Sequence, residues 1–323
     1  MQLSLESIGR APPANKLEAV TLFSGIGGCC TGAEQAGACV IWAANHWRVG
    51  VEAHAANHPW TEHLVQDLHT VPHYKIPDHD LLIASPSCKG WSPARGKARP
   101  LIDEKFRATA GIVVDVMESK KPEFAIIENV PEFESWARYE SWIAGIHALG
   151  YSTQNIIWDA ADSGVPQHRV RIYIICSRSK NPVDIRLDRR DHVPISTVLQ
   201  WDSGKWSSIF KKGRSDNTLT RIANGIDRGL SPRFIAPYYG SGSGLTGRNI
   251  NRPIGTLTTK ARWMLVDLSR CAMRMLNIHE AKLAMGFPPN YILPPKVSDA
   301  NIGLGNAVCP PVMQNIVEKI LAS

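Results

Sequence analysis

The chain has 323 residues, a net charge of +7 at pH 7 and 44% hydrophobic residues, which is ordinary for a globular protein. It contains no run of 18 apolar residues, and Met1–Glu6 has no basic region ahead of an apolar stretch, so we expect neither a membrane span nor a secretion signal. The basic excess suits a polyanionic partner but also occurs in proteins that bind none.

Apolar runs alternate with helical patterns between residues 19 and 176, which predicts a doubly wound α/β sheet. Apolar residues at helical spacing predict one of the helices over 106–119. Ligands of such sheets bind beyond the carboxyl ends of the strands, so functional residues are expected there. The predicted strands are Ala19–Phe23, Cys39–Ala43, Leu81–Ala84, Phe124–Glu128, Tyr151–Trp158 and Arg171–Cys176.

A glycine-rich turn follows the first predicted strand, where Phe23-Ser24-Gly25-Ile26-Gly27-Gly28 leads toward a helix that runs through Glu34. Glycines permit positive φ and let a ligand approach the backbone, and the N–H groups of the helix start favour polar or anionic atoms. The pattern predicts a nucleotide-type binding turn. It lacks the third spaced glycine of the dinucleotide-binding motif, which argues against a nicotinamide site.

Two polar strings follow two of the predicted buried strands. Pro86-Ser87-Cys88-Lys89 comes after Leu81–Ala84, and Glu128-Asn129-Val130 comes at the end of the strand that begins at Phe124. A thiolate can add to an electron-poor ring carbon, such as C6 of cytosine, when a nearby acid relieves the negative charge on the ring. Cys88 and Glu128 are therefore a candidate nucleophile and acid. For Cys88 alone, inert packing is the alternative, because free cysteines are mostly buried.

A basic stretch follows Cys88 directly and contains Gly90, Pro93 and Gly96. We expect a loop that closes over a phosphate backbone, and a solvated charged surface is the alternative. Its basic residues are Lys89, Arg95, Lys97, Arg99, Lys105 and Arg107.

The composition changes after residue 176, because the next segment is rich in Arg, Gly, Ser and Asn and holds one clear helix, over 217–228. We expect a large domain over 1–176, a small lobe over 177–250 and a return to the large domain over 251–323. Helical periodicity predicts two further helices, over 271–285 and 310–321.

Neither the cysteines nor the histidines predict a metal site. The seven cysteines show no metal-binding spacing, which together with their number fits a reducing compartment. Seven histidines crowd one segment, but cysteine or acidic partners at matching spacing are missing, and surface loops explain them. These histidines are His46, His54, His58, His63, His69, His73 and His79.

With these strings in order, the chain resembles the DNA cytosine carbon-5 methyltransferases over nearly its whole length. The glycine-rich turn is similar to the family's first methyl-donor motif, Cys88 to the nucleophile of its Pro-Cys loop, and Glu128-Asn129-Val130 to a further motif. Three later strings are similar to the Gln-x-Arg-x-Arg motif, the ninth motif and the last motif: Gln167–Arg171, Arg252–Thr259 and Gly305–Val308.

The resemblance implies a Rossmann-like, doubly wound mixed sheet, S-adenosyl-L-methionine as methyl donor with S-adenosyl-L-homocysteine as product, and double-stranded DNA as substrate. The implied catalytic residues are Cys88, Glu128, Arg169 and Arg171. The implied donor-binding residues are Phe23, Ser24, Gly25, Ile26, Gly27, Gly28, Asn45, His46, Asp67, Leu68, Pro86, Asn306 and Ala307. The residues expected at DNA are Lys89, Ser92, Arg95, Lys97, Arg99, Arg221, Arg228, Arg233 and Arg248.

The resemblance also implies a mechanism. The enzyme swings a cytosine out of duplex DNA, because the ring cannot be attacked from both faces while it is stacked. Cys88 adds to C6, Glu128 shares a proton with N3, C5 takes the methyl group, and elimination releases Cys88. Arg171 contacts the cytosine O2 and a phosphate, while Arg169 orders the loops of Cys88 and Glu128. The small lobe reads the DNA sequence.

Two departures from the family pattern affect these expectations. Pro86-Ser87-Cys88-Lys89 stands where two prolines, cysteine and glutamine are common, which changes the neighbours of the nucleophile. Asn45 stands where an acid commonly binds the ribose hydroxyls. An amide keeps the hydrogen bonds but loses their charge assistance, so we expect a modest affinity for the donor.

Three other functions stay open: an RNA cytosine methyltransferase with the same domain, a catalytically silent DNA-binding relative, and a nicotinamide oxidoreductase. The intact Cys88, Glu128 and Arg171 argue against the silent relative. We expect a cytoplasmic monomer that associates with the nucleoid through DNA and is encoded by a prokaryote or a phage. Where a cognate restriction endonuclease exists, we expect it to share the DNA site without binding this protein.

Overall fold

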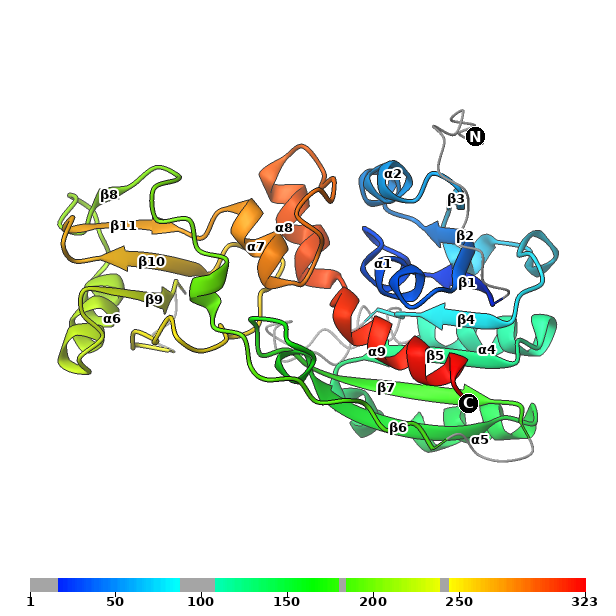
Figure 1. Cartoon of the computed structure of the whole chain (residues 1–323). Helices are drawn as coiled ribbons and strands as arrows, with labels where there is room; N and C mark the ends of the chain where they lie inside the picture. The colour runs from blue at the N-terminus through cyan, green and yellow to red at the C-terminus, as the bar shows by residue number, and fades with distance from the viewer. Residues whose placement is uncertain (1–16, 88–107, 180–183, 239–243) are drawn as a thin grey trace.

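The computed structural model describes residues 17–87, 108–179, 184–238 and 244–323. A seven-stranded sheet forms a large domain, and a four-stranded antiparallel sheet forms a small lobe at the other end of the molecule (Figure 1). The strands of the large sheet, in their order across it, are β3 (Glu62–Val65), β2 (Cys39–Asn45), β1 (Glu18–Leu22), β4 (Leu81–Ala84), β5 (Phe124–Asn129), β7 (Val170–Ser177) and β6 (Ser152–Asp159).

The large sheet is mixed, as predicted. Strands β1 to β5 run parallel, and β7 is antiparallel to both of its neighbours. The chain proceeds outward from β1 to β3 on one side and from β4 to β7 and β6 on the other, so the strand order reverses between β1 and β4. The carboxyl ends of the strands at such a reversal are where ligands of these sheets bind. The six predicted strands all exist and differ from the observed ones only at their ends.

Helices cover both faces of this sheet. Alternate residues of β4 show the two faces: Leu81 and Ile83 pack in the core that contains α1 and α9, while Leu82 and Ala84 pack in the core that contains α4 and α5. The helices of the large domain are α1 (Gly28–Gln35), α2 (Arg48–Asn57), α4 (Thr109–Lys120), α5 (Tyr139–Ala148), α7 (Ile278–Ala284), α8 (Val297–Asn306) and α9 (Pro310–Leu321).

Short 3₁₀ helices connect several of these elements. Within the described ranges, no helix is both long and apolar enough to cross a membrane. The 3₁₀ helices are η1 (Leu68–Thr70), η2 (His73–Lys75), η5 (Pro131–Ser135), η6 (Ala160–Ser163) and η7 (Ile195–Thr197).

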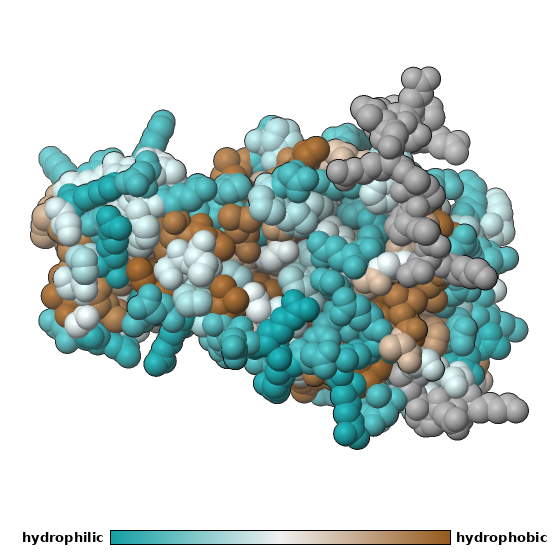
Figure 2. Space-filling model, viewed as in Figure 1, coloured by the Kyte–Doolittle hydropathy of each residue, from teal (hydrophilic) through white to brown (hydrophobic). Residues whose placement is uncertain are grey.

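The small lobe consists of the second sheet and α6 (Asp216–Asp227), whose Ile222 packs with Phe234 and Met264 of the sheet. Hydrophilic side chains project from its periphery around hydrophobic patches (Figure 2). The strands, in their order across the sheet, are β8 (Ser207–Ser208), β11 (Ala272–Met275), β10 (Trp263–Asp267) and β9 (Arg233–Pro237).

The boundaries predicted for the lobe differ from this arrangement at both ends. Strands β10 and β11 lie beyond residue 250 but pair with β9 and β8, so the lobe extends to Met275. At the other end, Ile185 donates its N–H to the side chain of Gln154 in β6 at 2.8 Å, and the Asn315 side chain of α9 bonds the backbone of Asp188. Residues 184–197 therefore run along the large domain before the lobe begins.

The helix predicted over 271–285 is wrong in its first half. Ala272–Met275 is strand β11, and α7 begins only at Ile278, after an N-terminal capping box formed by Asn277 and Glu280. Alanine and methionine favour helices, which is why the local pattern indicated one. Antiparallel pairing with β10 overrides this preference, because it buries Ala272 and Met273 against the lobe sheet. The predicted helices over 106–119, 217–228 and 310–321 correspond to α4, α6 and α9.

Candidate active site

The glycine-rich turn lies at the carboxyl end of β1. Three of its residues have positive φ: Phe23 at 59°, Gly25 at 55° and Gly27 at 91°. The Ser24 N–H donates to the carbonyl of Ala44 in β2 at 3.1 Å, which fixes the turn to the neighbouring strand. A Cβ atom placed on Gly25 would have no heavy atom within 4 Å. The turn is therefore open at Gly25, as a site that a ligand approaches along the backbone requires.

The last motif packs directly against this turn. A Cβ atom on Gly28 would lie 2.2 Å from the carbonyl oxygen of Val308, and one on Gly303 would lie 2.6 Å from the Ile26 side chain. Glycine is thus required at both contacts. Asn306 is exposed at the end of α8, and Ala307 is buried. Two regions almost 280 residues apart in the sequence therefore form one wall of the site.

The polar residues predicted at the donor site lie at the carboxyl ends of β2 and β3. The Asn45 side chain is buried and accepts a hydrogen bond from the Trp47 N–H at 2.9 Å, so its oxygen stabilises the start of α2 and its amide group stays available as a donor. His46 and Asp67 are exposed, and the Asp67 carboxylate caps η1 by accepting from the His69 N–H. Leu68 is buried beneath them.

The candidate acid lies at the end of β5. Glu128 is only 7% exposed, and its Oε1 is 3.2 Å from the Arg171 Nε. Antiparallel pairing explains the contact, because Glu128 lies opposite Tyr173 and Arg171 is two residues along on the same face of β7. The charged pair is therefore built into the strand register.

The surroundings of this pair are buried and carry a second arginine. Burial and the charge of Arg171 lower the pKa of Arg169 to about 10. Burial raises the pKa of Tyr173, and the Glu128 carboxylate adds to that shift. Burial likewise raises the pKa of Cys309 to about 11. Two arginines beside one carboxylate leave a local positive charge, which suits an anionic substrate group.

Arg169 holds the ninth and last motifs, a role that the sequence did not predict. Its side chain is 3% exposed and donates to the backbone carbonyls of Leu257, Gly305 and Ala307 at distances of 2.9–3.2 Å. It therefore fixes the ninth and last motifs to the sheet, while its predicted role at the Cys88 loop falls on residues outside the described ranges. Gln167 does the same on the preceding turn, since its side chain accepts from the Leu257 N–H and donates to the Ala284 carbonyl.

The predicted nucleophile, Cys88, lies outside the described residues, as do Lys89, Ser92, Arg95, Lys97 and Arg99. The segment leading to it is described. Pro86 is buried, and its carbonyl accepts a hydrogen bond from the Asn129 side chain at 3.2 Å. Asn129 directly follows Glu128. This hydrogen bond therefore joins Pro86, two positions before Cys88, to the residue that follows the candidate acid.

The four lobe arginines predicted at DNA have different environments. Arg221 is fully buried and donates to the carbonyls of Gly244 and Asn217, which is inconsistent with contact to DNA. Arg233 forms an ion pair with the buried Asp267 at 2.9 Å. Arg228 is exposed and donates to the Thr246 hydroxyl. Arg248 is exposed, and its guanidinium lies 5.4 Å from the ring centroid of Trp263.

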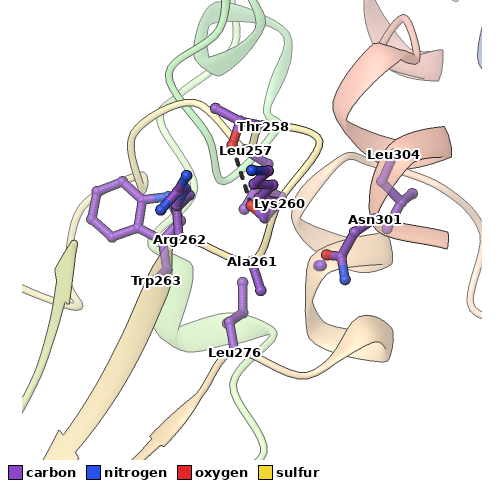
Figure 3. A pocket seen from close by; sticks show the side chains of 10 residues that line it. Leu257, Thr258, Lys260, Ala261, Arg262, Trp263, Leu276, Asn301 and Leu304 are labelled. Atoms are coloured by element: carbon purple, nitrogen blue, oxygen red, sulfur yellow. Dashed lines mark hydrogen bonds between the residues drawn. The ribbon is translucent and has the colours of Figure 1, made fainter. Parts of the chain in front are cut away.

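A small pocket lies where the ninth motif meets α8 (Figure 3). Thr258, whose hydroxyl donates to the Lys260 carbonyl, and Lys260 border it on one side, and Asn301 and Leu304 of α8 on the other (Figure 3). A Cβ atom on Gly305 would lie 2.3 Å from the Thr259 backbone nitrogen, so the ninth motif packs tightly on the end of α8. This junction brings the lobe next to the wall formed by the last motif.

A buried polar cluster behind the glycine-rich turn was not predicted. Surface loops do not explain all of the histidines: His46 and His69 are exposed as predicted, but His54, His58 and His79 are buried. His54 contacts Cys30 at 3.0 Å and His63 at 2.5 Å, and His58 donates to Glu34 at 2.8 Å. Among the described residues, no three such groups are arranged to hold a metal ion. The four-residue spacing of His54 and His58 on a helix was the signal that both share one face.

Comparisons with known proteins agree with this geometry. The C-5 cytosine-specific DNA methylase family model matches residues 17–322. The Type II methyltransferase M.SsoII of Shigella sonnei is 27% identical to this chain over 94% of it and 80% of its own length. The Type II methyltransferase M.HhaI of Haemophilus parahaemolyticus is also 27% identical, over 95% of each chain.

Solved structures show the same fold. A putative DNA modification methyltransferase encoded within an E. coli prophage has a TM-score of 0.69 at 20% identity, covering 95% of this chain and 99% of its own. A Spodoptera frugiperda DNMT2 mutant has a TM-score of 0.69 at 17% identity, covering 95% of this chain and all of its own. The family match extends over nearly every described element of both the large domain and the lobe. The chain belongs to the C-5 cytosine-specific DNA methylase family.

Proposed function

We propose that this protein transfers a methyl group from S-adenosylmethionine to C5 of a cytosine flipped out of duplex DNA. The observation that carries the proposal is the buried pair of Glu128 and Arg171 beside the bond from Asn129 to the Pro86 carbonyl. It combines a carboxyl group, a fixed cation and the start of the Cys88 segment at one edge of the sheet. Family membership supplies the reaction class, and these contacts support our assignment of its steps to particular residues.

The turn of Phe23–Gly28 fits the methyl donor. Gly25 has positive φ and open space where a side chain would project, which is the cradle that a ligand pressed against the backbone needs. When bound, S-adenosylmethionine supplies an electrophilic methyl group on its sulfonium. Asn45 and Asp67 lie at the ends of the adjacent strands and offer an amide and a carboxylate to ribose and adenine. The predicted partners that complete this site are His46, Leu68, Pro86, Asn306 and Ala307.

Cys88 and Glu128 act on the cytosine ring. The Cys88 thiolate forms a bond to C6, and Glu128 places a proton at N3, so the negative charge of the addition is neutralised and C5 becomes nucleophilic. Once C5 carries the methyl group, a base removes the C5 proton. The C5–C6 double bond then re-forms and the Cys88 thiolate leaves. Arg171 orients the Glu128 carboxyl group through its Nε and offers its remaining N–H groups to the cytosine O2 and a phosphate.

Covalent trapping tests this proposal. Duplex DNA with 5-fluorocytosine at the target should form a denaturation-resistant complex with the wild-type protein and S-adenosylmethionine, because fluorine at C5 blocks the final elimination. The Cys88→Ala variant should still bind DNA and donor but form no such complex. Cys271→Ala is the matched control, since Cys271 is an exposed cysteine of the lobe. Trapping by Cys88→Ala would contradict the assignment of the nucleophile.

The substrate and the biological setting need a separate experiment. We propose that the protein acts as a monomer on double-stranded DNA in the cytoplasm of a prokaryote, with or without a cognate restriction endonuclease. Bisulfite sequencing of host DNA after expression should show methylation at cytosines in one sequence context. Labelled methyl transfer to transfer RNA but not to duplex DNA would favour the RNA methyltransferase instead.

A further inference from the structure

The front and the rear of the glycine-rich turn have opposite surroundings. At the front, Gly25 faces open space. At the rear, a Cβ atom on Gly27 would lie 2.6 Å from the His54 ring and 2.7 Å from the Tyr291 hydroxyl. The turn is therefore tightly packed at Gly27, by two polar side chains that come from elements distant in the sequence, and open at Gly25.

Tyr291 bonds the turn itself. Its buried hydroxyl donates to the Ile26 carbonyl, which belongs to the peptide group that joins Ile26 to Gly27. Its ring packs on Phe287 with centroids 4.6 Å apart, and a Cβ atom on Gly28 would lie 3.1 Å from the Phe287 ring. Tyr291 thus contacts the turn directly through its hydroxyl and indirectly through the ring of Phe287.

The backbone around Tyr291 is itself fixed by two helices. The buried Lys282 ammonium of α7 donates to the carbonyls of Pro289 and Tyr291. The Asn57 side chain at the end of α2 makes two hydrogen bonds with the backbone of Ile292, at 2.8 and 2.9 Å. The Tyr291 hydroxyl therefore has little freedom to leave the Ile26 carbonyl.

Neighbouring imidazoles reinforce this arrangement, and two of them, His54 and His63, add no charge at neutral pH. Burial lowers the pKa of His63 to about 4 and the pKa of His54 well below its ordinary value. His58 is placed between the Thr31 hydroxyl at 3.2 Å, the Glu34 carboxylate and the Tyr291 hydroxyl at 3.5 Å. Thr31 also donates to the Gly27 carbonyl, so this second path reaches the same turn.

We propose that Tyr291 is a positioning residue for methyl-donor binding, acting through the Ile26 carbonyl from the side of the turn opposite the ligand. It holds Gly25 and Gly27 at positive φ, so the turn is already in the binding conformation before the donor arrives. Without the hydroxyl, the buried Ile26 carbonyl loses its partner and the turn relaxes to regain one. This inference rests on the proposed function, because it assumes that the donor binds at this turn.

The test compares two tyrosines that make the same kind of bond. Tyr151 is also buried and donates to the Pro122 carbonyl at 2.7 Å, in the core on the other face of the sheet. Tyr291→Phe should weaken S-adenosylmethionine binding, measured by calorimetry, about tenfold, which is the worth of one buried hydrogen bond. Tyr151→Phe should leave the donor Kd unchanged. It should lower the unfolding temperature about as much as Tyr291→Phe does, because each variant loses one buried hydrogen bond. At saturating donor, kcat of Tyr291→Phe should stay close to that of the wild type.

A second variant acts through the backbone of the same segment. Asn57→Ala should weaken donor binding about threefold, and its combination with Tyr291→Phe should cost less than the product of the two, because both act on one contact. Equal donor Kd values for wild type and Tyr291→Phe would overturn the proposal and leave Tyr291 a structural residue.

The binding readout separates this inference from the proposed function. A wild-type protein that binds the donor but methylates no DNA would contradict the proposed function alone, and the weaker donor binding of Tyr291→Phe would still support the positioning role. A wild-type protein that binds no donor would overturn both.

Discussion

The large domain brings charged residues together at a candidate site, whereas several charged residues of the lobe serve its packing. In the large domain, Glu128 and Arg171 meet at the carboxyl edge of the sheet, where parallel strands gather residues from distant parts of the sequence. In the lobe, Arg221 is buried against backbone carbonyls, and Arg274 forms a buried ion pair with Glu280 at 2.7 Å. Basic residues of the lobe therefore contribute to its stability as well as to its charge.

The reason lies in the size of the lobe. Its apolar core comprises few side chains, so arginines and tryptophans pack together to extend it. The guanidinium of Arg233 lies 4.8 Å from the Trp201 ring centroid, and that of Arg274 lies 5.1 Å from Trp206. An arginine in such a lobe is a candidate for DNA contact only if it remains exposed, as Arg248 does.

The largest effect is expected from the large domain. Glu128→Gln should lower kcat by about 10²- to 10⁴-fold, because an amide can hydrogen-bond the ring but cannot supply a proton. Single-turnover methyl transfer to duplex DNA measures this. Glu140→Gln, on the exposed side of α5, is the control and should behave as wild type. An unchanged rate for Glu128→Gln would refute the acid role.

Next comes the buried arginine of the lobe. Arg221→Met should lower the free energy of unfolding by about 3 kcal/mol, because buried carbonyl groups lose a charged donor. Urea denaturation checks this, with Arg228→Met, at the exposed C-cap of the same helix, expected within about 0.5 kcal/mol of wild type. A stable Arg221→Met protein with weakened DNA binding would restore the role in DNA binding predicted from the sequence.

Acidification should separate the two regions, since residues 198–276 contain no histidine. Burial lowers the pKa of His63 from 6.5 to about 4, so below pH 6.5 the unfolded state binds more protons than the folded state. The contribution of His63 to the free energy of unfolding is complete above pH 6.5. It is lost as the pH falls toward 4, by about 3 kcal/mol at most. Urea midpoints at several pH values should fall less steeply for His63→Gln. Parallel slopes for both proteins would contradict this.

The smallest effect is expected at the exposed lobe surface. Arg248→Ala should weaken DNA binding about threefold and reduce the salt slope of binding by about one unit, as expected for one lost phosphate contact. Fluorescence anisotropy at several salt concentrations measures both quantities. Arg186→Ala, at an exposed site of the large domain, is the matched control. A lost sequence preference with an unchanged salt slope would instead assign Arg248 to base reading.

The sequence predicted the large sheet well because its strands are short apolar runs that end in polar strings. Leu81–Ala84 is an example, because a parallel strand that is buried on both faces is a continuous apolar run. Such a run can be recognised without knowing which strands lie beside it. The lobe strands could not be found in the same way. Arg233–Pro237 begins with a charge that Asp267 pairs across the sheet, and Ala272–Met275 has helix-favouring residues, so both depend on long-range pairing that local sequence does not contain.

The candidate site was predictable in part for a similar reason. Motifs located Glu128, Arg171 and the turn, because the chemistry requires these residue types in order. They did not show that Arg169 faces backbone carbonyls or that Tyr291 reaches the turn. Both contacts join segments more than 80 residues apart, and only the folded chain brings those segments together.

The docking of α9 on α1 has a consequence for biosynthesis. Gly32 of α1 is so close to α9 that a Cβ atom would lie 2.3 Å from the Pro310 carbonyl oxygen. A ribosome releases the second of these helices long after the first, because most of the described sequence lies between them. The nascent polypeptide therefore lacks the support that α9 gives to α1 until α9 has been synthesised, and fragments that stop before α9 should leave the proposed donor site incomplete.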